Sequence, residues 1–325
     1  MDKIKLSNVL TKFIERHHVT LDKITPIKVD ASKRKYYRIQ KGKQFFILMD
    51  SSLEKKSMKN FIKISKWLIE NHFSSPFVYE NDLSEGICVI EDFGKNNFNR
   101  IIQNKPEKKK ILYLSTIELL SELSKVPPPN FLAFYTFEIF KSELDIFLKW
   151  EMSLKNKRCP EFIKDWNYLW KNYYALFKKT DFNTTVLKDF HIDNLFFLEN
   201  RSGIKKIGLI DFQDALIGHK CYDLVSLLQD VRVNIATKKR NFLYNHYVTI
   251  NNISEDSFED SYFIFGTQRL LKIIGIFNRL KYKYKKPQYM SYIPRTLSLL
   301  NHNLNKPLMH DLKIILKGQM KYEFK

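Results

Sequence analysis

Two neighbouring segments near the middle of the chain limit most strongly what it can fold into. Residues 186–195 read Val-Leu-Lys-Asp-Phe-His-Ile-Asp-Asn-Leu, which places Asp189 five positions before Asn194. An apolar segment then leads to Asp211, the first residue of Asp-Phe-Gln-Asp. One carboxylate for an attacking hydroxyl, with an amide and a second carboxylate to hold Mg²⁺ on ATP, is the layout of a phosphoryl-transfer site. Such a site needs alignment and positive charge rather than covalent help from the protein.

An Asp and an Asn at this spacing are weak evidence alone, because both residues are common in turns. The apolar context is more specific. An apolar strand precedes Asp189, and residues 195–198 and 205–210 form two more around the turn at residues 199–203. The 22 positions between Asp189 and Asp211 are enough for one hairpin to bring both into one site, so we interpret the three polar residues as a site.

Composition indicates a folded protein of one large or two smaller units. The chain has 325 residues, 44% of them hydrophobic, with only 9 Gly and 10 Pro. No apolar run has the length of a membrane span, and the N-terminus lacks the apolar core of a signal peptide. The cysteines are odd in number and far apart, which favours reduced thiols and a cytoplasmic location: Cys88, Cys159 and Cys221.

The formal charge of +20 raises the question of nucleic-acid binding. The lysines are spread along the whole chain, and the densest clusters, 108–110 and 281–286, lie at the ends of expected helices. No zinc-finger, helix-turn-helix or RNA-recognition signature accompanies them. We therefore expect no nucleic-acid partner, and attribute the charge to a lysine-biased surface that also attracts anions such as ATP.

The first part of the chain reads as a small α+β lobe over residues 1–93. A helix is expected at 3–16, a β-hairpin at 36–39 and 45–49 with Gly42 in the turn, a helix at 57–71 and a strand at 87–90.

Residues 94–325 read as a larger, mostly helical lobe. Pro127–Pro129 ends its first helix. The expected helices lie near 107–125, 138–155, 161–179, 220–232, 238–248, 256–282 and 307–320. Two such lobes form a cleft, a usual place for a ligand.

Several longer sequence motifs, spread over residues 28–300, resemble those of a known family. These are Asp-Ala-Ser at 30–32, Ile-Leu-Met-Asp at 47–50, Glu-Asp-Phe-Gly at 91–94, Leu-Lys-Asp-Phe-His at 187–191, Asp-Phe-Gln-Asp-Ala at 211–215, and Gln-Arg at 268–269. Together they resemble the aminoglycoside phosphotransferase and choline kinase superfamily, and most closely its bacterial branch of N-acetylmuramate and N-acetylglucosamine anomeric kinases. The resemblance implies a two-lobed, protein-kinase-like α+β fold.

The resemblance also implies roles for individual residues. Asp189 corresponds to the catalytic base, and Asn194 and Asp211 to the Mg²⁺ ligands, whose hard oxygen atoms suit that ion. The expected nucleotide-binding residues lie in the loop at 30–38 and in the hinge at 91–93: Ser32, Arg34, Arg38, Glu91 and Phe93.

Four residues are candidates for the acceptor side. His191 typically braces the catalytic loop in this superfamily. Gln213 and Asp214 follow Asp211 and can face a sugar, although Asp214 can equally bond to local backbone. Arg269, like Arg232, offers a guanidinium to a substrate carboxylate, with surface or core-bracing use as the alternative.

Four other residues are expected to have structural roles. Asp223 is expected to anchor its helix or the catalytic loop. Trp150, Trp166 and Trp170 are expected in the core rather than under a sugar.

The sequence departs from the superfamily pattern at two places. Leu187 stands where a His is usual, and the strand at 46–50 has no lysine for the nucleotide phosphates. Arg34, Lys33 and Arg38 are candidates to replace that lysine. Because that lysine is absent, the protein could be a catalytically weak or inactive member of the superfamily.

The expected activity is transfer of the ATP γ-phosphate to a small hydroxylated molecule, with ATP and Mg²⁺ as cofactors and an amino sugar as partner. The acceptor stays open among the anomeric hydroxyl of N-acetylmuramate or N-acetylglucosamine, another sugar, an aminoglycoside and a choline-like alcohol. A pseudokinase or nucleic-acid-binding module is the alternative outside enzymes. No membrane partner is expected, and the sequence does not indicate an oligomeric state.

Overall fold

The computed structural model describes residues 8–16, 23–27, 33–152, 159–178, 182–317 and 319–320. Contacts divide the chain into two compact units: Met1–Ser115 with Ile192–Ala215, and Thr116–His191 with Leu216–Lys325. These bounds differ from the lobes expected at 1–93 and 94–325, because the hairpin before Asp211 packs within the first unit. The lobe boundary after residue 93 stays a prediction.

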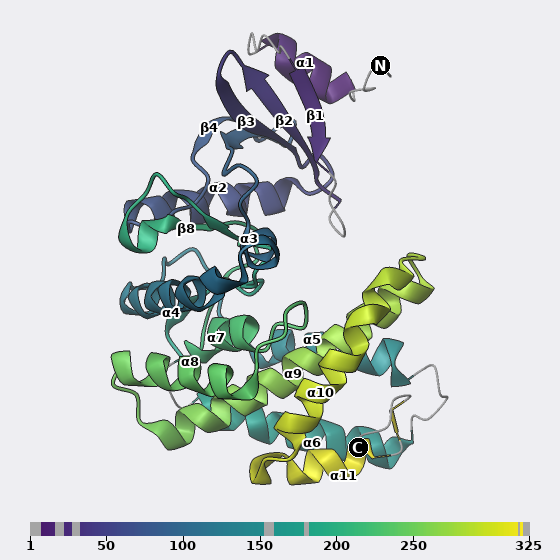
Figure 1. The fold of residues 1–325 in the computed structure, drawn as a ribbon. Helices are drawn as coiled ribbons and strands as arrows, with labels where there is room; N and C mark the ends of the chain where they lie inside the picture. The colour runs from purple at the N-terminus through teal and green to yellow at the C-terminus, as the bar shows by residue number, and fades with distance from the viewer. Residues whose placement is uncertain are drawn as a thin grey trace. The chain divides into compact units, whose positions relative to one another are not determined.

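The first unit is built on a five-stranded antiparallel sheet (Figure 1). The β2–β3 hairpin turns at Gly42, whose φ of 59° favours glycine. One face of the sheet packs on Phe13 of the helix α1, in a cluster that includes Ile39 and Leu48. The strand order is β1 (Lys23–Ile27), β2 (Lys35–Lys41), β3 (Gln44–Asp50), β5 (Ile87–Glu91) and β4 (Val78–Asp82).

The hairpin that follows residues 187–191, the expected catalytic segment, belongs to this unit. It pairs Leu195 with Leu209, and the Leu209 N–H donates to the Ser74 carbonyl at 2.8 Å. The rings of Phe61 and Phe212 stack at 5.1 Å. The remaining elements of the unit are α1 (Asn8–Arg16), α2 (Lys55–Glu70), α3 (Phe98–Asn104), η1 (Pro106–Lys108), β7 (Leu195–Phe197), η3 (Gly203–Lys206) and β8 (Ile207–Leu209), and α4 (Lys109–Lys125) runs from it into the second unit.

The second unit is helical apart from one two-stranded sheet, in which β6 (Thr184–Val186) pairs with β9 (Leu216–Gly218). The long helix α9 (Glu255–Tyr282) approaches α5 (Phe137–Trp150) closely at Gly275, where a Cβ would lie 2.6 Å from the Ile146 carbonyl oxygen. Its other elements are α6 (Pro160–Lys178), α7 (Cys221–Leu228), α8 (Thr237–Ile250), η4 (Pro287–Tyr292), α10 (Ile293–Leu304), η5 (Pro307–Met309) and α11 (His310–Leu316).

Aromatic side chains fill the core of the second unit. Trp166 and Trp170 are buried and meet edge to face, and Phe147 stacks on Trp166. The prediction that tryptophans belong to the core is confirmed for Trp166 and Trp170, whereas Trp150 is only half-buried. Among the residues that the structure describes, no helix is long and apolar enough to cross a membrane.

Most predicted elements are present with shifted ends. The helix expected at 220–232 ends at Leu228, and the one expected at 307–320 is a short 3-10 turn followed by α11. Residues 3–7 of the first expected helix lie outside the described residues. Two helices, α3 and α10, were not predicted. Pro294 obscures α10, although it lies in the first turn, where its missing N–H removes no helical hydrogen bond.

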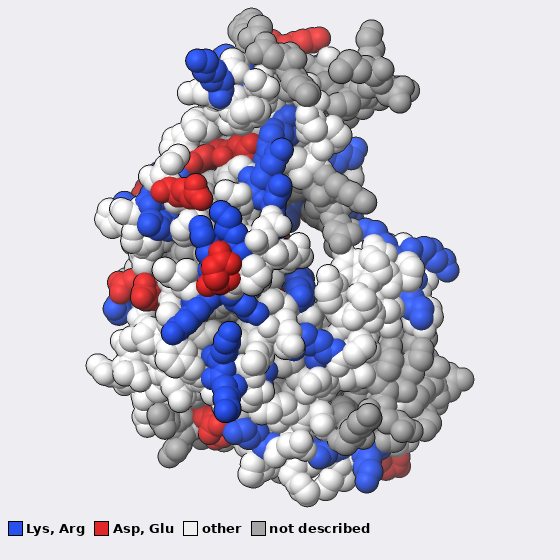
Figure 2. All heavy atoms as spheres, in the orientation of Figure 1, with Lys and Arg blue, Asp and Glu red and all other residues white. Residues whose placement is uncertain are grey.

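Basic side chains are dispersed over the face of the molecule that Figure 2 draws. On the face in Figure 2, lysine and arginine lie at many separate places among uncharged and acidic residues. The positive charge of the chain is therefore not gathered into one stripe on this face.

Candidate active site

The catalytic segment lies in the second unit, directly after β6. Asp223 in α7 accepts the N–H of Leu187 at 2.6 Å and that of Lys188 at 3.0 Å. The Ser226 hydroxyl donates to the Lys188 carbonyl at 3.2 Å. These three bonds hold the backbone immediately before Asp189, whose side chain is exposed. The prediction that Asp223 anchors the loop is confirmed.

The backbone at Lys188 is in the left-handed region, with φ at 70°. A non-glycine residue there is held at a cost of roughly 1–3 kcal/mol, and such positions concentrate at functional sites. The bonds from α7 offset that cost.

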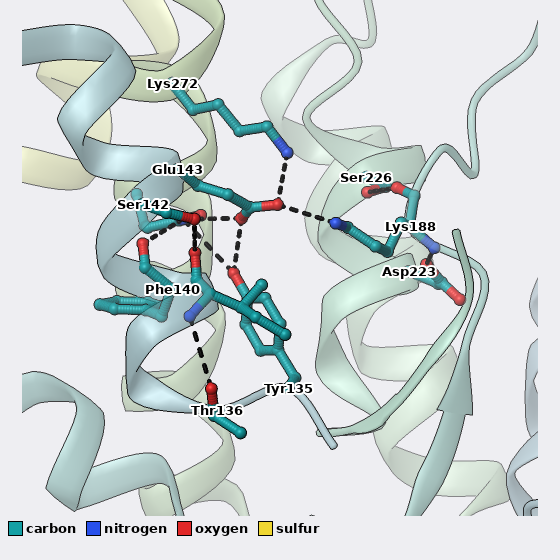
Figure 3. A network of polar contacts seen from close by, with 11 residues as sticks. Tyr135, Thr136, Phe140, Ser142, Glu143, Lys188, Asp223, Ser226 and Lys272 are labelled. Carbon is teal, nitrogen blue, oxygen red and sulfur yellow. Dashed lines mark hydrogen bonds and ion pairs between the residues drawn. The ribbon is translucent and has the colours of Figure 1, made fainter. Parts of the chain in front are cut away.

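The Lys188 side chain enters a buried polar network centred on Glu143 (Figure 3). One oxygen of Glu143 contacts the ammonium groups of Lys272 at 2.7 Å and Lys188 at 3.0 Å. The other accepts the Tyr135 hydroxyl at 2.6 Å and the Gln268 amide at 3.0 Å. Burial alone would raise the pKa of Glu143, but the two lysines outweigh it and hold the pKa well below its usual value. Glu143 is thus a carboxylate that ties the catalytic loop to α5 and α9.

His191 is buried beside two arginines. Burial first, then the charges of Arg232 and Arg269, lower its pKa well below the usual histidine value. Its imidazole is therefore neutral at physiological pH. This state suits a residue that braces the loop better than one that donates a proton.

Arg269 is a buried arginine that makes no hydrogen bond or ion pair with any described residue. It is 7% exposed. Its charge acts on His191, Tyr222 and the carboxyl of Asp223. The charge of Asp189 also acts on Tyr222 and Asp223. The loop that carries Asp189 thus lies within the electrostatic reach of a guanidinium that forms no ion pair with a described carboxylate.

In the first unit the hairpin brings Asn194 and Asp211 together. The Asn194 amide nitrogen lies 3.5 Å from Asp211 Oδ2, and the Ile210 N–H donates to the Asn194 carbonyl at 3.2 Å. Asp211 has a φ of 61°, so it is a second strained position in the sequence-predicted site. The two residues expected to bind Mg²⁺ thus lie side by side, and their role as ligands stays a prediction.

Arg34 joins this pair. Its guanidinium donates to Asp211 Oδ1 and to Gln213 Oε1, each at 2.8 Å, and lies 3.8 Å from Glu54. Gln213 in turn donates to Asp211 at 3.1 Å. Arg34, at 8% exposed, is therefore a fixed cation beside an expected Mg²⁺ ligand.

The other predicted nucleotide residues lie in separate contacts. Arg38 forms a paired hydrogen bond with Asp92 and also donates to the Gly94 carbonyl at 2.9 Å. Glu91 binds Arg201 through its side chain. Their roles in nucleotide binding stay predictions.

Phe93 packs against the hairpin. The Phe93 ring lies 6.0 Å from the ring of Phe196. It also packs directly on Gly208, where an added Cβ would lie only 2.7 Å from the Phe93 ring. Ser32 lies outside the described residues. Asp214 is exposed.

The oxygen donors of Asn194 and Asp211 fit a magnesium site. Among the described residues, no group of three or more His, Cys, Asp and Glu side chains could hold a metal. Mg²⁺ does not need one, because it keeps waters and binds through one or two protein ligands plus phosphate oxygens. The donor set is compatible with Mg²⁺ that arrives with a nucleotide.

Sequence reasoning missed the Glu143 network. Gln268 and Lys272 are spaced to lie on one face of a helix, which is a detectable signal. Glu143 has no local signal, because its charged partners, Lys188 in the loop after β6 and Lys272 in α9, lie far away in the sequence.

The comparisons identify the family. The model of a phosphotransferase enzyme family matches residues 23–245, more than half of the chain. The chain belongs to this family.

Relatives and a solved structure agree with the phosphotransferase assignment. An N-acetylmuramate/N-acetylglucosamine kinase of Neisseria meningitidis serogroup B is 30% identical, over 92% of this chain and 90% of the relative. One of the same name from Caulobacter vibrioides is 26% identical, over 87% and 88%. The ADP-bound aminoglycoside phosphotransferase APH(2'')-Ib superposes with a TM-score of 0.60 at 12% identity, over 90% of this chain and 96% of that one.

These matches confirm two predictions. The chain is a phosphotransferase enzyme, and its fold is the kinase-like α+β fold, with an antiparallel sheet and a mostly helical remainder.

Proposed function

We propose that this phosphotransferase moves the γ-phosphate of ATP to the anomeric hydroxyl of N-acetylmuramate or N-acetylglucosamine. The observation that carries the proposal is the similarity, over about nine-tenths of both chains, to a kinase named for those two sugars. The nucleotide is supported by the fold, which an ADP-bound phosphotransferase shares.

The residues divide the chemistry between them. Asp189, exposed and set by a strained, anchored loop, orients the sugar hydroxyl and takes its proton. Asn194 and Asp211 hold Mg²⁺, which neutralises charge on the phosphates. Arg34 supplies a cation to the phosphates in place of the missing strand lysine, since its guanidinium already lies against Asp211.

Arg269 indicates which of the two sugars the enzyme binds better. N-acetylmuramate carries a lactyl carboxylate that N-acetylglucosamine lacks. A buried guanidinium without an acidic partner among the described residues suits that group. We therefore place the carboxylate of N-acetylmuramate at Arg269.

The test is a purified-protein screen with ATP, Mg²⁺ and candidate acceptors, with the product identified by phosphorus NMR. A sugar 1-phosphate is the expected product, and it lacks a reducing end. Asp189→Asn and Asp211→Ala should each lower turnover by about 10³-fold or more while the circular dichroism spectrum is kept. Asp165→Asn, an exposed Asp of α6, is the matched control and should be fully active. Phosphorylation only of aminoglycosides or choline, or near-normal turnover of either variant, would contradict the proposal.

A further inference from the structure

A polar cavity lies in the second unit, and the catalytic segment does not line it. Its volume is about 220 Å³, and its lining comes from the start of α8, the segment before it, and α10. None of the residues at 187–191 or 194–211 lines it. The cavity is smaller than a site for a drug-sized ligand, so its size suits a small ion or one end of a metabolite.

Two arginines, Arg240 and Arg295, bring positive charge to the cavity. His302 also lines it, and no Asp or Glu is among the lining residues. Arg295 is held in place by the Asn234 side chain at 2.7 Å and by the Asp230 carbonyl at 3.5 Å. Both of these acceptors are uncharged groups.

Arg240 is the most informative residue of the lining, because it is a buried cation. It is 5% exposed, and its guanidinium makes no hydrogen bond or ion pair with any described residue. A buried charge without a counter-charge is costly, and buried arginines are normally paired. Its charge acts on Tyr262 and on His302, whose pKa is lowered by burial first and then by Arg240 and Lys306. An anion bound in the cavity would supply a counter-charge to Arg240.

The start of α8 adds a second donor set. Ala236 is its N-cap and has no side chain to accept the first N–H groups, and the first turn contains no acidic residue. Both Ala236 and Thr237 line the cavity. The positive end of a 14-residue helix thus opens into the space beside Arg240.

We propose that this cavity is a binding site for a phosphate group, either as the free ion or as the end of a small phosphate monoester. A dianion there would pair with Arg240 and Arg295 and accept the first N–H groups of α8. The Thr237 and Ser298 hydroxyls, which are exposed at the cavity, would complete its hydrogen bonds.

Three variants separate a binding site from a structural arginine. Arg240→Met removes the unpaired charge and keeps the apolar stem. Lys239→Met removes one charge from the same turn of α8 at an exposed residue outside the lining, and is the matched control. Ser298→Asp places a carboxylate at an exposed lining residue without disturbing the interior.

Isothermal titration calorimetry and thermal unfolding are followed with inorganic phosphate, glycerol phosphate and, at equal ionic strength, chloride. Wild type and Lys239→Met should bind at least one of the two phosphate probes and melt about 2 °C or more higher at saturation, whereas chloride has no such effect. Arg240→Met and Ser298→Asp should bind at least tenfold more weakly. Without phosphate, Arg240→Met should melt no lower than wild type, because an unpaired buried charge is removed.

Two outcomes overturn the proposal. One is absence of phosphate-dependent stabilisation in the wild type with both probes. The other is unchanged affinity in Ser298→Asp and Arg240→Met, which would place the anion elsewhere. Binding of the free ion alone, or of the monoester as well, identifies which form the cavity accepts. Either result supports the proposal of a phosphate site.

Discussion

The buried network around Glu143 makes the strongest quantitative prediction. Replacing Glu143 with Gln keeps the shape but leaves Lys188 and Lys272, whose side chains are 17% and 18% exposed, without their shared counter-charge. Removing one partner of a buried ion pair costs about 3–5 kcal/mol. We expect Glu143→Gln to lower the free energy of unfolding by that amount, and to lower turnover because Lys188 precedes Asp189.

A double-mutant cycle isolates the contact between Glu143 and Lys188. At 3.0 Å and limited exposure, the pair should show a coupling energy of about 1–2 kcal/mol, so the double variant with Lys188→Met loses less than the sum of the single variants. The matched control lies on the same helix: Lys141 and Asp145 are 3.0 Å apart but exposed, and should couple by only about 0.3–0.5 kcal/mol.

Urea unfolding followed by circular dichroism is the suitable assay, because urea does not screen charges as a salt does. The reasoning is refuted if the two pairs couple equally, or if the Glu143 and Lys188 effects add to within about 0.5 kcal/mol. Equal coupling would mean that burial of the network gives it no advantage over a surface ion pair.

Two further predictions concern buried charges near the catalytic loop. Arg269→Met should raise the KM for N-acetylmuramate about tenfold to hundredfold while changing that for N-acetylglucosamine little, measured by steady-state kinetics; equal losses for both sugars would argue against a carboxylate contact. Burial raises the pKa of Asp223 to about 7. Between about pH 4 and pH 7 the folded state therefore keeps a proton that the unfolded state has lost. The free energy of unfolding should fall as pH rises through this range, by roughly 4 kcal/mol in all. His191, with its lowered pKa, gives the opposite slope below about pH 6.5. The difference in unfolding free energy between wild type and Asp223→Asn, in which His191 cancels, should therefore change with pH in that range, and a constant difference would contradict the assignment.

The β2–β3 hairpin and helix α2 show what local patterns predict well. Gly42 provides the turn, and apolar residues recur at the spacing of one face. The hairpin that joins Asn194 to Asp211 follows from the same logic, because two short apolar strands around a polar turn have few other arrangements. α10 was missed, since Pro294 reads locally as a break and only its place in the first turn makes it harmless.

The candidate site could be predicted in part for the same reason. Asn194 and Asp211 lie at the ends of adjacent strands, so their convergence is a local property. Arg38 and Glu91 were assigned to the nucleotide through the resemblance, and the structure shows them bound to Asp92 and Arg201. Such pairs connect residues far apart in sequence, which no spacing rule reveals.

The sequence by itself determined the reaction: which residue types stand at the ends of which strands, and hence the phosphoryl-transfer chemistry. This follows from turn chemistry and hydrophobic period, which act over a few residues. Only the tertiary structure decided the partners of those residues. Arg34 meets Gln213 across 179 positions, and Lys272 meets Glu143 across 129. Whether a buried charge has a counter-charge depends on which helices pack together, and that separates the paired Glu143 from Arg240 and Arg269, which have no such partner among the described residues.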